Sequence, residues 1–267
     1  MDCSPDGSSV HAERSRRYYP SGLVAAVVAS ALIGRRRSFL RDASACAATL
    51  RPPLKVHDAS KPEGSGRPNK LLIVFNHYTR PGFPAWWTAF ALGSALVRVG
   101  LAQPEPRWVM TATLTHLVGL FAPLSRWALR RIANIYDGFL MPPMPPDPKD
   151  TEARAATARQ VLTFARHTPN ARVCLAPEGY DNNDGQLIVP PPGAGRFLLQ
   201  LCRAGMTILP AGVCTEGGVY HVHFGSTFSL DTPQDLASAA RDEWASRRVM
   251  SAIAELLPLR LRGSIVS

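Results

Sequence analysis

The sequence predicts an α/β protein built on a central sheet that is mixed or mostly parallel. Short apolar runs typical of buried strands alternate with longer segments of helical periodicity from about residue 54 to residue 257. The chain has 267 residues, which is enough for one large domain or two small ones with a sizeable core. Hydrophobic residues make up 46% of it, a share that is high for a soluble protein and low for one that crosses a membrane many times.

The first 53 residues differ in character from the rest. Residues 1–17 are polar and are expected to form a disordered leader. Residues 18–53 are expected to form a helical region that associates with a membrane. Its apolar run, residues 23–33, falls short of the roughly 20 residues that a spanning helix needs. Three arginines at positions 35–37 stand where a signal peptide would have its cleavage site. With basic and tyrosine residues beside it, the run suits a helix lying on an anionic membrane surface; a helix docked on the protein is the alternative.

The predicted strands are short runs rich in β-branched and aromatic residues. They lie at residues 54–57, 71–75, 108–110, 133–136, 172–176, 207–213 and 220–224. Residues 71–75, Leu-Leu-Ile-Val-Phe, are apolar throughout, so this strand is expected in the buried centre of the sheet. The last strand alternates polar and apolar residues and places His221 and His223 on one face. No third ligand is evident in the sequence, so we predict no metal site there.

The predicted helices follow from apolar residues at helical spacing and from the proline and glycine residues that end them. They lie at residues 23–33, 38–50, 86–99, 113–132, 151–166, 194–204 and 235–257, with Pro123 kinking or dividing the fourth. Residues 61–69 are rich in glycine and proline and are expected to be a linker loop. Residues 141–148 are dense in proline and are expected to form an extended loop.

The charge balance indicates an anionic partner. The formal net charge is +10, and no acidic residue occurs between Arg107 and Tyr136. No nucleic-acid-binding motif is visible, so lipid or an acidic substrate is the favoured partner and nucleic acid is not expected. The five cysteines show no CxxC spacing and lie among apolar neighbours, which favours reduced thiols in a cytoplasmic setting.

Candidate functional residues follow two of the predicted strands. Asn76-His77 comes directly after residues 71–75, and Pro177-Glu178-Gly179 follows residues 172–176. Ligands of open α/β sheets bind at the carboxyl ends of strands, and imidazole has a pKa suited to proton transfer near neutrality. A third segment, residues 190–196, opens a helix whose N-terminal amides could hold an anion.

In order and spacing, these blocks resemble the glycerolipid acyltransferase family of the bacterial lysophosphatidate acyltransferase type. Asn76-His77 stands where that family has Asn-His-four residues-Asp, and Pro177-Glu178-Gly179 matches its Pro-Glu-Gly motif. Gly193-Ala194 and Ile208-Leu209-Pro210 match its later blocks, and residues 253–263 resemble the end of such chains. The resemblance covers about residues 54–263, which we take as an acyltransferase-like α/β domain.

The resemblance implies an O-acyltransferase. His77 would be the general base on an acceptor hydroxyl, which attacks the thioester of acyl-CoA or of an acyl-carrier protein as co-substrate. Substrate contacts are expected from Asn76, Arg80, Glu178, Gly179, Tyr180 and Arg196. No metal and no tightly bound cofactor is implied. The partners would be membrane lipid and the acyl donor, at the cytoplasmic face of a membrane, with a peripheral or monotopic attachment.

The chain also departs from the family pattern. Gly82 occupies the position of the motif Asp, Tyr180-Asp181 replaces the frequent Thr-Arg, and an arginine of the second motif is absent near residues 135–138. Three interpretations remain open. The protein is an active acyltransferase for a different acceptor, with His77 oriented by a backbone carbonyl or by another carboxylate such as Asp181, Asp184 or Glu178. Alternatively, it is an inactive homologue that binds lipid or acyl chains. The third possibility is a conventional enzyme for phosphate-bearing acceptors with rewired residues.

Overall fold

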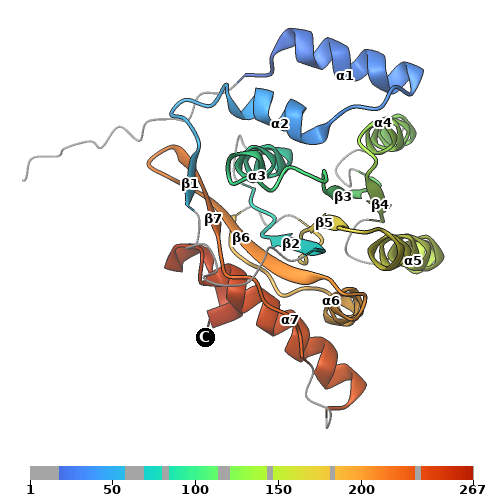
Figure 1. The fold of residues 1–267 in the computed structure, drawn as a ribbon, viewed down its shortest axis with the longest axis vertical. Helices are drawn as coiled ribbons and strands as arrows, with labels where there is room; N and C mark the ends of the chain where they lie inside the picture. Colours follow the sequence, from blue (N-terminus) through green and yellow to red (C-terminus); the bar gives the residue numbers. More distant parts are fainter. Residues whose placement is uncertain are drawn as a thin grey trace, which may run out of the picture.

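The computed structural model describes residues 18–57, 69–79, 84–113, 121–142, 147–180, 184–231 and 236–266. In this part of the chain a seven-stranded sheet has helices on both faces (Figure 1), which confirms the predicted α/β class. The expected leader at residues 1–17 and nearly all of the expected linker at residues 61–69 lie outside the described residues.

The sheet is mixed but mostly parallel, as predicted. Its strands are β1 (Lys55–His57), β2 (Leu71–Phe75), β3 (Arg107–Thr111), β4 (Phe139–Met141), β5 (Arg172–Leu175), β6 (Thr207–Glu216) and β7 (Val219–Phe224). They are arranged in the order β1-β7-β6-β2-β5-β3-β4. The five strands from β6 to β4 run parallel, whereas β7 is antiparallel to β6 and β1 is parallel to β7. The carboxyl ends of β2, β3, β4 and β5 therefore meet at one edge of the sheet.

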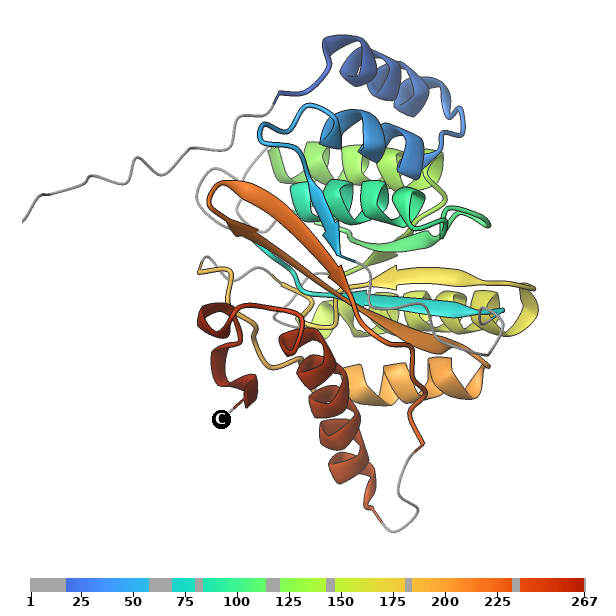
Figure 2. The same ribbon diagram turned by 60° about the vertical axis from the view of Figure 1, so that its left-hand side comes forward.

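The helices form layers on the two faces. They are α1 (Ser21–Ile33), α2 (Phe39–Ala47), α3 (Trp86–Arg98), α4 (Phe121–Ile135), α5 (Thr151–His167), α6 (Ala194–Arg203) and α7 (Ser238–Ala254). Short 3-10 helices occupy Pro148–Asp150, Leu259–Leu261 and Gly263–Val266. Figure 2 shows α2, α3 and α4 on one side of the sheet, with α1 as an outer layer, and α5, α6 and α7 on the other side.

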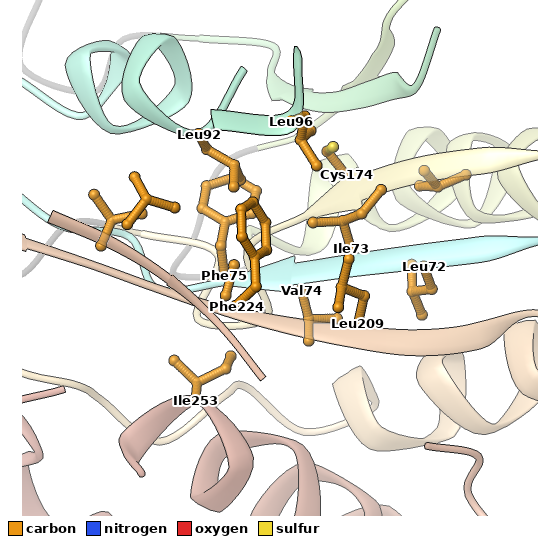
Figure 3. Close-up of a cluster of buried hydrophobic side chains, with 14 of the residues drawn as sticks. Leu72, Ile73, Val74, Phe75, Leu92, Leu96, Cys174, Leu209, Phe224 and Ile253 are labelled. Carbon is orange, nitrogen blue, oxygen red and sulfur yellow. The ribbon is translucent and has the colours of Figure 1, made fainter. Parts of the chain in front are cut away.

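The centre of the core is β2, all five residues of which are buried. Figure 3 shows its side chains between α3 on one face and the α7 side of the sheet on the other. The labelled residues around it are Leu92, Leu96, Cys174, Leu209, Phe224 and Ile253, all of which belong to one buried apolar cluster. An apolar strand that pairs on both sides and packs on both faces has a fixed position. The end of β2 therefore fixes where the residues that follow it begin.

The segment before β1 is tied to this core through α2. Arg37 donates to both carboxylate oxygens of the buried Asp42, at 2.6 and 2.8 Å, and the Tyr136 hydroxyl donates to Asp42 at 2.9 Å. Burial, followed by the Asp42 carboxylate, raises the pKa of Tyr136, so the hydroxyl keeps its proton as a donor. Phe39 of α2 packs on the Trp108 ring with centroids 4.6 Å apart.

The outer helix α1, unlike α2, is mostly exposed to solvent. Ser30 is its only buried residue, whereas Val24, Val28, Leu32 and Ile33 are exposed. Between 45% and 74% of each of these four residues is exposed. Among the described helices, none combines the length and the hydropathy needed to cross a membrane.

One predicted strand is wrong. Residues 133–136 are the end of α4 and the residue after it, and the strand lies three residues further on, in β4. Tyr136 N–H donates to the carbonyl of Ile132 in the helical pattern, and Asp137 then turns into a left-handed conformation with a φ of 54°. The apolar residues of this segment pack in helical form against neighbouring elements, and this packing outweighs their strand propensity. Pro123 lies in the first turn of α4, where its missing N–H costs no helical hydrogen bond.

Candidate active site

A pocket lies where the carboxyl ends of the parallel strands meet. Its volume is about 290 Å³. His77 follows β2, Thr111 ends β3, and Gly179 lies in the loop after β5, so three strands contribute to its wall. The other lining residues are Val109, Met110, Met141, Pro142, Arg154, Ala158, Leu175, Ala176, Pro177, Pro191, Pro192, Gly193, Ala194, Phe197 and Leu198. The wall is thus mainly apolar with few polar groups, which is the usual composition of a ligand site.

His77 is fixed through its backbone. Its N–H donates to Oε2 of Glu178 at 2.5 Å, which joins the end of β2 to the loop after β5. The next residue, Tyr78, is buried; its carbonyl accepts from the Thr88 hydroxyl at 2.7 Å, and its own hydroxyl bonds that of Thr215 at 2.7 Å. The imidazole is half-buried, with a buried Nδ1, and faces the pocket. Hydrogen bonds therefore hold the backbone on both sides of the imidazole.

Glu178 fastens two loops. The side chain is buried, with 2% exposed, and each carboxylate oxygen accepts a backbone N–H: Oε2 that of His77 and Oε1 that of Ile188 at 3.0 Å. A buried carboxylate is stable only with such charge-assisted hydrogen bonds. Glu178 thus positions His77 by way of the backbone and is not among the residues that line the pocket.

Asn76 has a comparable role on the other side of β2. Its Nδ2 donates to the Val213 carbonyl at 2.9 Å, and its Oδ1 accepts from the Val213 N–H at 2.7 Å. The side-chain amide thereby extends the β2–β6 ladder beyond the last pair, Phe75 with Ala211. With 1% exposed and both amide groups engaged, Asn76 supports the site and does not line the pocket.

Arg154 is the cationic side chain among the pocket-lining residues, and it was missed from the sequence. It lies in α5, one turn before Ala158, and its guanidinium donates to the Pro142 carbonyl at 3.2 Å. The available signal was its place on the same helix face as the apolar positions Ala158, Val161 and Ala165. A long cationic side chain at the end of such a stripe reaches from the core face toward a strand end.

Arg196 is not a pocket residue. It is exposed on α6, and its backbone N–H donates to Asp242 Oδ1 at 2.7 Å. The Gly193 N–H donates to the other oxygen of the same carboxylate at 2.6 Å. The helix N-terminus whose amides could hold an anion thus binds a carboxylate of the protein's own α7, which satisfies those amides.

The remaining predicted residues have different positions. Gly179 adopts a φ of 73° and lines the pocket, so a glycine suits that turn. Tyr180, next to it, is exposed and does not line the pocket. Arg80, the motif position Gly82 and the candidate carboxylate Asp181 lie outside the described residues. Asp184 is described and exposed.

The similarity of this chain to known proteins lies in its fold. No family model and no curated protein matches the chain. Among solved structures, the fold is similar to the crystal structure of the 1-acyl-sn-glycerophosphate (LPA) acyltransferase, PlsC, from Thermotoga maritima. The TM-score is 0.47 and the identity 10%, over 87% of this chain and 88% of that chain. An identity of 10% leaves the chemistry of this chain to be decided by its own residues.

Proposed function

We propose that this protein is an O-acyltransferase that moves a fatty acyl group from a thioester donor, acyl-CoA or acyl-carrier protein, to the hydroxyl of a lipid acceptor. The observation that carries the proposal is the position of the His77 imidazole. An imidazole stands at the carboxyl end of the central buried strand, is held by Glu178 through its backbone, and faces a pocket with mainly apolar walls. The order of the sequence motifs around His77 and Glu178 points to the same chemistry.

The reaction requires one proton to move twice. His77 accepts the proton of the acceptor hydroxyl while the oxygen attacks the thioester carbonyl. The tetrahedral intermediate then breaks its carbon–sulfur bond, and the imidazolium returns the proton to the departing thiolate, so the products are an ester and a free thiol. A positioned base of this kind contributes about 10²–10⁴-fold to the rate.

The pocket walls suit an acyl chain. Val109, Met110 and Met141 of β3 and β4 form one side, and Phe197 of α6 lies on another. Each methylene buried there contributes about 0.8 kcal/mol to binding. Arg154 is the positive group of this pocket and is our choice for an anionic part of the donor or acceptor, in place of Arg196.

We further propose that the protein works at the cytoplasmic face of a membrane, attached peripherally through α1 and α4. The two helices pack on each other, and α4 exposes Phe121, Leu124 and Trp127. Exposed arginines lie close to these residues in the sequence, at positions 35, 36, 126 and 130. Apolar side chains with cationic neighbours suit a surface of anionic lipid.

A second candidate function is favoured by the hydrogen bonds of Glu178. Both of its oxygens accept hydrogen bonds from backbone amides, as expected of a residue that holds two loops together. In addition, Gly82 occupies the position of the motif Asp. Loss of the corresponding Asp lowers the rate of a serine protease about 10⁴-fold. The alternative is therefore a homologue without catalysis that binds lipid or acyl chains in the same pocket.

The deciding experiment measures thiol release from long-chain acyl-CoA and acyl-carrier protein over a panel of phosphorylated and neutral lipid acceptors. The variants are His77→Ala and, as a matched control, His167→Ala, which removes an exposed histidine at the end of α5. The proposal expects acceptor-dependent release in the wild type and the control, and its loss in His77→Ala. If folded protein binds acyl-CoA and releases no thiol with any acceptor, the binding homologue is correct.

A further inference from the structure

Three histidines lie together on the edge of the sheet that is farthest from β4. His57 is the last residue of β1, and His221 and His223 belong to β7. The sequence alone placed His221 and His223 on one face and offered no third ligand. In the structure β1 pairs in parallel with β7 and sets His57 directly beside His223. A residue 164 positions away from His221 thus completes a group of three.

The three side chains converge. Nε2 of His57 lies 2.9 Å from Nδ1 of His221, and one ring nitrogen from each histidine lies within 4.8 Å of the other two. The rings of His57 and His223 stack with centroids 4.2 Å apart and planes 6° from parallel. Nitrogen ligands lie about 2.0–2.1 Å from a bound zinc ion, which places two of them about 3–4 Å apart. Side-chain rotations that close the widest gap by about 1 Å would bring all three nitrogens into range.

The backbone holds this arrangement in register. Alternation along β7 points His221 and His223 to the same face, and the pairing of His57 with His223 fixes the third side chain on that face. On the inner side, His223 pairs with Gly212 of β6, over which Leu256 packs. The group therefore has an apolar border toward the core, while His57 is exposed to solvent at the edge. Such a border supports a metal ion by limiting the access of water.

The electrostatics favour the neutral imidazole that a metal requires. Burial, followed by repulsion from His57, lowers the pKa of both His221 and His223. Lys55 acts in the same direction on His221, whereas the nearby Glu216 raises the pKa of both histidines. Both shifts favour the neutral form of His221 and His223, and a bound ion would replace the hydrogen bond between Nε2 of His57 and Nδ1 of His221.

We propose that His57, His221 and His223 form a binding site for a divalent transition metal ion, with Zn²⁺ as the expected occupant. Imidazole is the ligand type that zinc, copper and nickel prefer, and tetrahedral zinc takes three histidines with one further position for water. None of the three residues lines the His77 pocket, so the site is separate from the proposed acyltransferase site. Its role is structural: the ion fastens the three-residue edge strand β1 to β7, where few ladder hydrogen bonds are available.

The test uses full-length protein without a polyhistidine tag, stripped of metal by a chelator and then titrated with ZnCl₂ in a calorimeter. Equilibrium dialysis with elemental analysis gives the stoichiometry. We expect one ion per chain, and a fall in affinity of at least tenfold in each of His57→Gln, His221→Gln and His223→Gln. His167→Gln and His77→Gln, which remove histidines elsewhere, are expected to bind as the wild type does.

Co²⁺ substitution distinguishes the ligands. Histidine and water ligation gives weak visible bands, whereas thiolate ligation adds strong near-ultraviolet absorption, which matters because the chain has 5 cysteines. Thermal melts of the metal-free Gln variants show whether they fold. Absence of stoichiometric binding in the wild type, equal affinity in folded His223→Gln, or a thiolate spectrum would each overturn the proposal.

Discussion

The two histidine sites of this protein are built in opposite ways. His77 stands at the end of a central strand, and the residues that support it, Asn76 and Glu178, belong to recognisable sequence blocks. The three-histidine group at the β1–β7 edge arises because two strands far apart in the sequence pair in one register. A strand end can be recognised from one stretch of sequence, whereas a cross-strand site becomes visible only once the neighbouring strand is known.

The largest expected effect separates the two sites by function. His77→Ala removes the proposed base and should lower acceptor-dependent thiol release by about 10²–10⁴-fold, while zinc affinity stays within twofold of the wild type. His223→Gln should lower zinc affinity and leave thiol release unchanged. Both variants are measured in both assays. If His223→Gln also abolished thiol release in folded, metal-free protein, the two regions would not act independently.

Features that depend on one stretch of sequence were predictable, whereas features that depend on packing were not. The β2 strand was predictable because five consecutive apolar residues allow no exposed face, and His77 followed from its end. The strand placed at residues 133–136 was wrong because apolar residues at a helix end resemble a short strand until the packing surface is known. Arg154 was missed because a charged residue on an amphipathic helix is solvated by default, and its place on the apolar face was too weak a signal to outweigh that expectation; in the fold it lines a pocket.

Zinc binding should stabilise the edge of the sheet. An ion that binds only the folded state, at a concentration 100 times its Kd, contributes about 2.7 kcal/mol and should raise Tm by roughly 5–10 °C. Thermal unfolding with and without ZnCl₂ measures this shift, with His223→Gln as the control that should show none. A shift of equal size in the variant would place the bound ion elsewhere in the protein.

The support of His77 can be weakened without touching the imidazole. In Glu178→Gln, the new amide presents an NH₂ group to one of the two backbone N–H donors, so one buried hydrogen bond is lost at a cost of about 1–3 kcal/mol. We expect a lower Tm and a lower kcat, with zinc affinity unchanged. Glu243→Gln, on the exposed face of α7 where Glu243 pairs with Arg247, is the matched control. An unchanged kcat in Glu178→Gln would show that the backbone clamp does not position His77.

The smallest expected effect is that of a substitution in the outer helix α1. Leu32 of α1 is 58% exposed, so Leu32→Glu should leave Tm nearly unchanged. If α1 lies on lipid, the charge removes one apolar contact of about 1.5 kcal/mol, and binding to vesicles that contain anionic lipid should fall about tenfold in a sedimentation assay. Leu259→Glu is the control, because Leu259 is also exposed, at 78%, but belongs to the C-terminal segment on the other side of the sheet (Figure 2). Equal losses in both variants would mean that charge alone, and not the α1 surface, governs attachment. A loss confined to Leu32→Glu would locate the membrane contact on the helical layer that contains α1. That layer and the pocket walls formed by α5 and α6 lie on opposite faces of the sheet (Figure 2). The acyl chains would then have to reach the pocket around the ends of the strands, where His77 stands.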